Sequence, residues 1–463
     1  MDNSKIKITI LGAGISGLAT AYWLSKDGYD ITVLESKNEP GGSMESRHED
    51  GFLIDYGPNS GLETNPFIGQ IVRELDLNDE FMYASDEGKK RYILRDNQLH
   101  ALPMNPIAFL TTGLFSSKAK FRVLAEPFIG KSEDGYYQSI SEFVKRRLGR
   151  EFLDYAINPF VAGVFAGNPD HLSVKSAFPK LYRLEEVYGG LFKGLIKGAK
   201  ERKGIGEESK QSARMFSFKG GMQILPKAIA DKLGNSILYN CNVEKVIQAK
   251  NGFEVLYTHE QNFVKDFADI VISAIPAYKA TSVFVDLDDG LSGHLDRIYY
   301  PPVKVLYIGF RKGVIGRTLD GFGFLIPEKE QKTFLGAIWS STIFPFRANE
   351  GCEAFTLFVG GARSPDMVCD ENKQHVAHVL EEFKKLMDID EDPIFIKEKI
   401  WPMAIPQYDL GHIEHDRYFE SFEIKHPGIF LSGNYRGGIS VGDCIQNSQL
   451  TYQRIKDHIG TSH

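Results

Sequence analysis

A glycine pattern near the beginning of the chain constrains its fold more than any other feature. The pattern GxGxxG occupies residues 12–17, directly after the apolar stretch Lys7–Leu11 and directly before Ile15–Lys26, where small and apolar residues have helical spacing. Ile31–Leu34 is predicted to be a second strand. We therefore expect a strand–helix–strand unit over residues 6–35 that binds a dinucleotide.

Each glycine of this pattern has its own physical role. Gly12 permits a tight turn after the strand, Gly14 lets a pyrophosphate approach the backbone, and Gly17 lets helix and strand pack closely. The pyrophosphate is expected at the N-terminus of the helix, where free N–H groups and the helix dipole favour an anion. Glu35 ends the second strand, where a carboxylate can bind ribose hydroxyls.

Two further turns favour FAD over NAD as the dinucleotide. Pro40–Gly42 is a second glycine turn that follows Glu35 closely, and Gly57–Ser60 (Gly-Pro-Asn-Ser) is a third turn. Such turns bring more backbone against a long cofactor.

Later segments return to the arrangement of a strand, glycines and a helix. Asp269–Ala274 is a short apolar strand that we expect to join the first sheet, and Ile429–Leu431 is a strand followed by glycines and by a helix from about Asp443. The pattern predicts one cofactor domain that is built from distant parts of the chain. Other helices are expected over Pro66–Leu75, Ser139–Leu148 and Gly220–Leu233, other strands over Ile237–Leu256 and Val303–Phe310, and a loop over Gly189–Lys210.

Composition narrows the classes of function. The net charge of −7 argues against nucleic-acid binding. The cysteines lie far apart without a CxxC pair and the histidines have no ligand spacing, so we expect neither a disulfide framework nor a metal site. We see no targeting segment or membrane-spanning stretch, and we expect a cytoplasmic protein that at most lies on the inner face of the cell membrane.

Ten segments, in order along the chain, resemble the protoporphyrinogen oxidase family of flavin-dependent amine-oxidase-type proteins. They are DYGPNS (55–60), LHALP (99–103), SSKAKFRVLAEPF (116–128), NPFVAGVFAGNPDHLS (158–173), FPKLYRLE (178–185), FKGGMQILP (218–226), DGFGFLIP (320–327), IWSSTIFPFR (338–347), IWPMAIPQYDLGH (400–412) and IFLSGNYRGGISVGDCI (429–445). Together with the N-terminal GAGISGL, VLES and PGGS, they cover nearly the whole chain.

The resemblance implies a fold of α/β and α+β parts. It implies a discontinuous Rossmann-like FAD domain, an inserted substrate-binding sheet domain, and a mainly helical domain that contacts the membrane. We accordingly assign FAD-binding parts to residues 1–85, 212–285 and 411–463, the helical part to residues 86–211, and the substrate-binding part to residues 286–410.

The resemblance also implies FAD contacts where this chain matches the motifs of the family. These are Gly12, Ala13, Gly14, Ile15, Ser16, Gly17, Glu35, Ser36, Gly42, Ser43, Gly57, Pro58, Asn59, Ser60, Val243, Asn434, Ile439, Ser440 and Val441. Val243 is also compatible with a plain core valine. Three residues depart from the family: Ser43 stands where Arg or Trp is frequent, Asn59 where Arg is frequent, and Asn168 where Asp is usual.

A porphyrinogen is a large apolar macrocycle with carboxylates, so its site needs an apolar surface beside the flavin and a cation at the rim. Arg91 matches the propionate-binding arginine of the family. Leu325 and Phe344 match positions that sandwich the rings, and Gly163 matches a loop that faces the macrocycle. Taken alone, Arg91 is equally compatible with a solvated charge, and Leu325 and Phe344 with core packing.

The function implied by the resemblance is oxygen-dependent oxidation of protoporphyrinogen IX to protoporphyrin IX in haem biosynthesis, by a CH–CH oxidoreductase that uses FAD. We expect no catalytic side chain, because the flavin carries the chemistry. Coproporphyrinogen III is the alternative substrate. Another FAD-dependent amine or carotenoid oxidoreductase, a porphyrin carrier without turnover, a redox-neutral flavin mutase and a homodimer also remain open.

Membrane contact is expected where basic and apolar residues interleave. Residues 89–131 hold eight lysines and arginines against two acidic residues, and residues 190–203 add a second segment of this kind. Such a surface is suited to the interface of an anionic bilayer, although an amphipathic helix packed on its own domain has the same pattern. The apolar residues of the first segment are Phe109, Leu110, Leu114, Phe115, Phe121 and Leu124.

Overall fold

The cofactor sheet expected from the sequence is a five-stranded parallel sheet in the order β10–β2–β1–β14–β20. It is seen in a computed structural model that describes residues 3–133, 136–205, 213–369 and 373–461. The strands are β1 (Lys7–Leu11), β2 (Asp30–Leu34), β10 (Ile237–Leu238), β14 (Ile270–Ser273) and β20 (Ile429–Leu431). The predicted strands at 269–274 and 429–431 are confirmed, because β14 pairs with β1 and β20 pairs with β14.

Alternating side chains of this sheet bury an apolar core on each face. Ile8 and Ile10 point into one core, while Val271 and Leu431 point into the other. The first core is closed by α1 (Ile15–Ser25), α2 (Pro66–Glu74), α11 (Ile224–Leu233) and α18 (Val441–Thr461). The second is closed by α12 (Ala277–Val283), α13 (Asp289–Asp296), α17 (His412–Lys425) and the antiparallel sheet of β11 (Cys241–Ala249), β12 (Gly252–His259) and β13 (Asn262–Ala268).

A seven-stranded sheet forms the second unit, in the order β19–β15–β18–β17–β16–β7–β8. Its strands are β7 (Tyr92–Arg95), β8 (Gln98–Ala101), β15 (Val303–Arg311), β16 (Gly323–Leu325), β17 (Gly336–Ile338), β18 (Cys352–Gly360) and β19 (Phe395–Trp401). The hairpin of β7 and β8 comes from the segment that we expected to be mainly helical. Because β7 pairs with β16, this hairpin is part of the seven-stranded sheet. The helix α13, at the beginning of the expected substrate-binding part, instead packs on α17 of the first unit.

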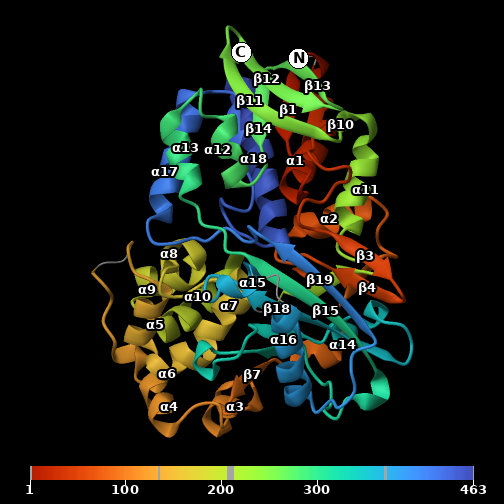
Figure 1. Cartoon of the computed structure of the whole chain (residues 1–463). Helices are drawn as coiled ribbons and strands as arrows, with labels where there is room; N and C mark the ends of the chain where they lie inside the picture. Colours follow the sequence, from red (N-terminus) through yellow and green to blue (C-terminus); the bar gives the residue numbers. More distant parts are fainter. Residues whose placement is uncertain (1–2, 134–135, 206–212, 370–372, 462–463) are drawn as a thin grey trace.

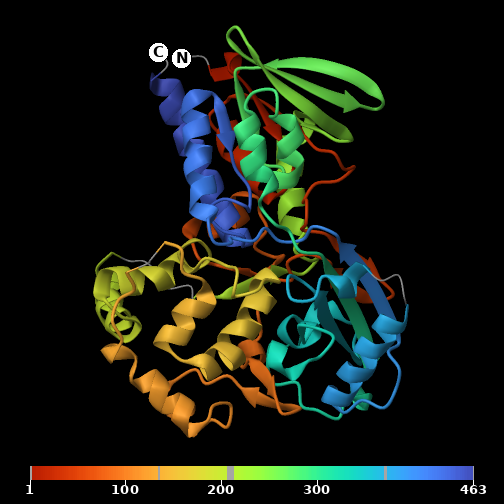
Figure 2. The same cartoon turned by 60° about the vertical axis from the view of Figure 1, so that its left-hand side comes forward.

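The two faces of the seven-stranded sheet have different neighbours. The helix α16 (Lys373–Met387) covers one face, with Phe383 in its core. The opposite face meets Phe52 of β4 (Phe52–Asp55) from the cofactor unit and Ala162 of the helical unit. Figures 1 and 2 show the consequence: both chain ends lie on the cofactor unit, and the sheet unit and the helical unit lie side by side at its other end.

Short elements complete the cofactor and sheet units. Two small antiparallel sheets are formed by β3 (Ser46–Glu49) with β4, and by β5 (Gly61–Leu62), β9 (Met215–Phe218) and β6 (Phe81–Tyr83). The helices α14 (Ser340–Ile343) and α15 (Asp366–Cys369) flank β17 and β18. Within the described residues, none of the helices combines the length and the apolar character needed to cross a bilayer.

The helical unit includes one helix that the sequence did not lead us to expect. Its helices are α3 (Pro106–Thr111), α4 (Ser117–Leu124), α5 (Ile140–Arg147), α6 (Arg150–Phe152), α7 (Asn158–Phe165), α8 (Val174–Ala177), α9 (Pro179–Tyr188) and α10 (Leu191–Ile205). The loop expected over Gly189–Lys210 is wrong as far as Ile205, because α10 occupies it; residues 206–210, like the expected domain boundary at 211, lie outside the described residues. The helix forms because Leu191 is buried and because the Glu126 carboxylate accepts hydrogen bonds from the N–H groups of Leu191 (2.7 Å) and Phe192 (3.2 Å).

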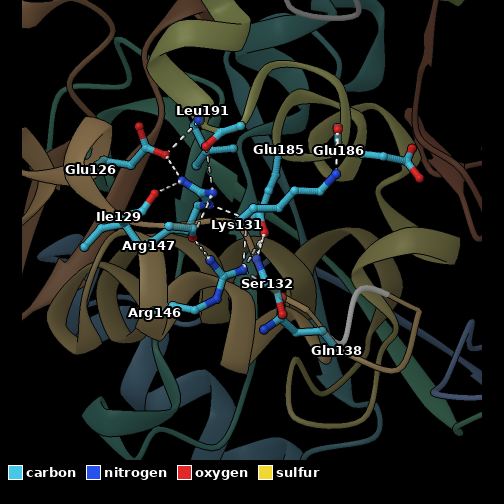
Figure 3. A network of polar contacts seen from close by, with 12 residues as sticks. Glu126, Ile129, Lys131, Ser132, Gln138, Arg146, Arg147, Glu185, Glu186 and Leu191 are labelled. Carbon is cyan, nitrogen blue, oxygen red and sulfur yellow. Dashed lines mark hydrogen bonds and ion pairs between the residues drawn. The ribbon is translucent and has the colours of Figure 1, made fainter.

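A buried ionic network holds the helical unit together (Figure 3). The guanidinium of Arg147 lies 2.6 Å from Glu126 and also pairs with Glu185, and the three side chains are almost completely buried. Arg146 pairs with the same Glu185 at 2.9 Å. Glu126, in the 3₁₀ turn at 126–128, caps the N-terminus of α10, while Arg147 ends α5 and Glu185 lies in α9. The network therefore joins these three helices. Burying any of these charges alone costs free energy, so each side chain is stable in the interior only while its ionic partners are present.

We expect Arg147→Met to weaken the helical unit strongly, because it leaves Glu126 and Glu185 buried without their cation. The free energy of local opening of α9 and α10 should fall by about 3–5 kcal/mol, measured by hydrogen–deuterium exchange of their amides. Arg150→Met is the matched control: Arg150 is exposed and pairs with Asp154 at i,i+4, so the loss should stay below about 0.5 kcal/mol. Equal effects of the two substitutions would contradict this account of the network.

Candidate functional site

The first glycine turn brings backbone atoms so close together that side chains are excluded. Gly12 has φ +97° and donates its N–H to Leu34 O at 2.8 Å, at the end of the neighbouring strand. A Cβ on Gly17 would lie 2.1 Å from Gly12 O. Gly14 differs, because a Cβ there would meet no atom of the described residues within 4 Å. The turn therefore leaves no room for a side chain at Gly17, whereas the space next to Gly14 can hold a ligand.

The N-terminus of α1 is uncapped, which suits an anion. Among the residues that the structure describes, no side chain caps this helix at Gly14, whereas Asn65 caps α2 and Ser139 caps α5. The first N–H groups of a helix need partners, and a phosphate at the open side of Gly14 would supply them. Ala13, Ile15 and Ser16 are buried and give the turn its rigid base.

The second turn packs directly on the first, and the third turn packs on the second. Gly41 donates its N–H to Ala13 O (2.8 Å), and a Cβ on Gly42 would lie 3.2 Å from the Cα of Gly14. A Cβ on Gly57 would lie 1.8 Å from Ser43 O, so the third turn presses on the second. Ser43 itself is exposed, and Pro58 and Ser60 are half-buried. The three turns expected to hold the cofactor thus form one continuous backbone surface.

Glu35 anchors the end of β2 beside these turns. Its buried carboxylate accepts the N–H of Ala13 (2.7 Å) and the N–H of Lys37 (2.8 Å). The oxygen Oε2 accepts only the N–H of Ala13 among the described residues and can accept a further hydrogen bond, so a ribose hydroxyl can still bind there. The Ser36 hydroxyl also lies 3.3 Å from Glu35 Oε1. The strand β11 starts at the same place, because Cys241 N–H donates to Glu35 O at 2.8 Å, and Val243 follows two residues later at a β-bulge.

A glycine loop from the end of the chain completes this surface. Tyr408 donates its hydroxyl to Asn434 O and accepts the N–H of Gly438, both at 2.8 Å, so one buried phenol spans the loop. Ile439 packs on the helical unit, and Val441 starts α18 with Ser440 as its cap, since Asp443 N–H donates to Ser440 Oγ (3.1 Å). Near the start of α18, Cys444 is buried in the same core as Ile15, the first residue of α1. The role of Tyr408 was not predicted, because its partners lie 26 and 30 residues away.

A buried ion pair joins the third turn to the sheet unit. Asp55, two residues before Gly57, lies 2.5 Å from Arg347. Burial raises the pKa of the Asp55 carboxyl, and the guanidinium of Arg347 opposes that shift. The same guanidinium donates to Ser217 Oγ (2.6 Å), and Thr356 Oγ1 donates to the side-chain oxygen of Asn59 (3.1 Å). Asn59 therefore lies within a network that spans the two units. Ser217, Arg347 and Thr356 were missed, since polar residues in different units give no local signal.

The residues expected to bind substrate lie in two groups. Gly163 of α7 is exposed and Leu325 of β16 is half-buried, and they touch: a Cβ on Gly163 would lie 2.5 Å from Leu325 Cδ2. Arg91 precedes β7, whose Ile93 is the register partner of Leu325. Arg91 is exposed and lies 5.7 Å from the Phe322 ring, and burial of its surroundings lowers the pKa of the guanidinium. Phe344 is only 1% exposed and packs beside Arg347 instead.

Comparison with known proteins gives a consistent result. The model of the family "Flavin containing amine oxidoreductase" matches residues 15–455. Protoporphyrinogen oxidase 2, chloroplastic/mitochondrial, of Arabidopsis thaliana is 34% identical over 95% of this chain and 91% of its own length. Coproporphyrinogen III oxidase of Bacillus subtilis (strain 168) is 27% identical over 97% of both chains. The crystal structure of an Exiguobacterium sp. 255-15 protein has a TM-score of 0.81 over 98% of this chain and 99% of that chain, at 21% identity, which confirms the fold.

We expect Gly14→Ala to leave the fold intact and to weaken FAD binding at least tenfold. The φ of Gly14 is −72°, which alanine adopts readily, and the added methyl group would meet only the space in which we place the pyrophosphate. Titration of the FAD-free protein with FAD, followed by flavin fluorescence, measures the loss. Gly460→Ala in α18 is the control, because its Cβ also meets nothing within 4 Å. Unchanged affinity in Gly14→Ala would place the cofactor elsewhere.

Proposed function

Because this chain belongs to the flavin-containing amine oxidoreductase family and, within it, to the protoporphyrinogen oxidases, we propose that it oxidises protoporphyrinogen IX to protoporphyrin IX. The cofactor of this family is FAD. When bound, FAD accepts two electrons at a time from the substrate and is reoxidised by O2. Removal of six electrons and six hydrogens converts the substrate to the aromatic porphyrin, so three O2 become three H2O2.

The proposal rests on one observation: the cation Arg91 lies near the accessible apolar contact between Gly163 and Leu325. Gly163 and Leu325 touch, and Phe160 and Val164 of the same helix α7 expose apolar surface next to them. Arg91 lies one strand away. An apolar macrocycle with carboxylates on its rim matches this combination, whereas a small amine would leave the apolar surface uncovered.

Each residue of the proposed site has a physical task. Arg91 binds a propionate through a charge-assisted hydrogen bond. Leu325 and Gly163 support the macrocycle, whereas the buried Phe344 packs against Arg347. Tyr408 and Asn59 hold the loops on which the flavin rests. No side chain needs to act as an acid or base in this proposal, since binding and orientation are the tasks of the protein.

Coproporphyrinogen III is the second candidate substrate. The relative from Bacillus subtilis carries that activity in its name and matches this chain from end to end. The two substrates differ in two vinyl groups against two extra propionates, so the cations around the macrocycle decide between them.

We expect the purified protein to be yellow and to convert protoporphyrinogen IX into a fluorescent porphyrin with one H2O2 per two electrons. Arg91→Met should lower kcat/KM about tenfold or more, mainly through KM, because it removes a binding interaction of the ground state. The rates with both porphyrinogens and with putrescine, measured side by side, identify the substrate class. Amine turnover without porphyrinogen turnover would refute the proposal.

We also propose that the helical unit rests on the inner face of the cell membrane of a cytoplasmic enzyme. Large apolar side chains are exposed on α3 and just before it, on α4 and on the 3₁₀ turn at 126–128. The helices α3 and α4 lie at the end of the molecule that is farthest from the chain ends (Figure 1). The exposed apolar side chains are Met104, Ile107, Leu110, Phe121, Leu124 and Phe128. Lys118 is exposed among them. Leu114 and Phe115 do not contribute, because they are buried in the unit.

Flotation with vesicles of phosphatidylglycerol tests this surface. We expect the protein to float at low salt, and Phe121→Glu with Phe128→Glu to reduce the bound fraction at least fivefold, because two charges would enter the interface. Ile424→Glu is the control: Ile424 is 81% exposed on α17, in the cofactor unit. Wild-type protein that stays at the bottom of the gradient, or an equal loss in the control, would refute the membrane surface.

A further inference from the structure

A second arginine without an acidic partner lies next to the proposed substrate position. Arg363 follows β18, in a stretch that presses on the end of α7. Ala362 donates its N–H to Ala166 O at 2.7 Å, and a Cβ on Gly361 would lie 2.6 Å from the same oxygen. Ala166 ends the helix that carries Gly163, and its φ of +49° is left-handed. The backbone before Arg363 is therefore held firmly against the substrate loop.

The guanidinium of Arg363 lies between the two elements that meet at Gly163 and Leu325. Its Nη1 donates to Ile326 O at 3.2 Å, directly after Leu325, and lies 3.3 Å from Asn158 Oδ1 at the start of α7. Both acceptors are neutral. The side-chain amide of Asn158 donates to Glu328 Oε2 at 3.1 Å, so this carboxylate is held by Asn158.

The charge of Arg363 is not compensated by a carboxylate. In the part of the chain that the structure describes, Arg363 forms no ion pair, its Nε is buried without a hydrogen-bond partner, and its Nη2 makes no hydrogen bond. Burial lowers the pKa of the guanidinium, and the charge of Glu328 opposes this shift. The buried Arg147 and Arg347, by contrast, pair with Glu126 and Asp55. A desolvated cation with free donors is suited to a carboxylate from outside the chain.

Arg363 and Arg91 lie at opposite ends of the same strand. Arg91 lies near Phe322, just before β16, and Arg363 contacts Ile326, just after it. Four residues of extended chain separate these two points by about 13 Å. A ligand lying across Leu325 and held at both ends needs carboxylates on two separate edges.

We propose that Arg363 is a second carboxylate-binding residue of the substrate site, and that with Arg91 it favours tetrapyrroles whose carboxylates surround the ring. This inference rests on the proposed oxidation of a porphyrinogen and favours the second candidate substrate, coproporphyrinogen III, over protoporphyrinogen IX. Coproporphyrinogen III has a propionate on each pyrrole and reaches both arginines. Protoporphyrinogen IX has propionates on two neighbouring pyrroles, and it places them at Arg91 only.

The test compares wild type, Arg363→Met and Arg363→Lys in holoenzyme. Binding of coproporphyrin III and protoporphyrin IX is titrated by porphyrin fluorescence, and kcat and KM are measured for the two porphyrinogens. We expect Arg363→Met to raise the Kd of coproporphyrin III and the KM of coproporphyrinogen III at least tenfold, with changes below threefold for the protoporphyrin pair and in kcat. Arg363→Lys should recover part of the loss. Arg311→Met, at an exposed arginine that pairs with Glu391, is the control.

The outcomes separate the two claims. Equal losses for both ligands, or no loss for either, overturn the role of Arg363. A wild-type protein that binds both porphyrins with the predicted dependence on Arg363 but oxidises neither porphyrinogen refutes the proposed function and leaves this inference standing. A wild-type protein that binds neither porphyrin overturns both. FAD content and melting temperature of each variant show whether the fold is retained.

Discussion

The close backbone approach at the first glycine turn is the constraint on which the rest of this structure depends. Gly17 can stand against Gly12 only without a side chain, and Gly41 hydrogen-bonds to the residue between Gly12 and Gly14. The parallel sheet then brings the end of β2, the beginning of β11 and the loop before α18 to the same edge. Segments more than 400 residues apart thus form one surface, and the N-terminus of α1, which none of the described side chains caps, faces it.

The ion pair of Asp55 and Arg347 links this surface to the sheet unit. A buried pair contributes little net stability against an apolar replacement, but breaking it by removal of one partner costs about 3–5 kcal/mol. The pair therefore specifies one arrangement of the two units. The network of Glu126, Arg147 and Glu185 has the same effect inside the helical unit. The proposed substrate position lies where the helical unit and the sheet unit meet.

Sequence patterns predicted the elements that are stabilised locally and missed those that depend on distant partners. The strand–helix–strand unit and the strands at 269–274 and 429–431 were predicted, because buried parallel strands and glycine turns leave strong local signals. The helix α10 was missed, since its N-terminus is capped by Glu126, 65 residues away. Arg363 was missed for a similar reason: only the fold places it beside Leu325, whereas Arg91 was found through the motif of a family.

Anaerobic mixing of the holoenzyme with a porphyrinogen tests the central claim most directly, because it observes electron transfer without a role for O2. The account predicts that the flavin absorbance near 450 nm bleaches as each FAD takes two of the six electrons, that porphyrin fluorescence follows only when O2 is admitted, and that Gly14→Ala, which lacks firmly bound FAD, shows neither signal. Flavin that remains oxidised in the presence of bound porphyrinogen would contradict the account, since the chain would then hold both molecules without transferring electrons between them.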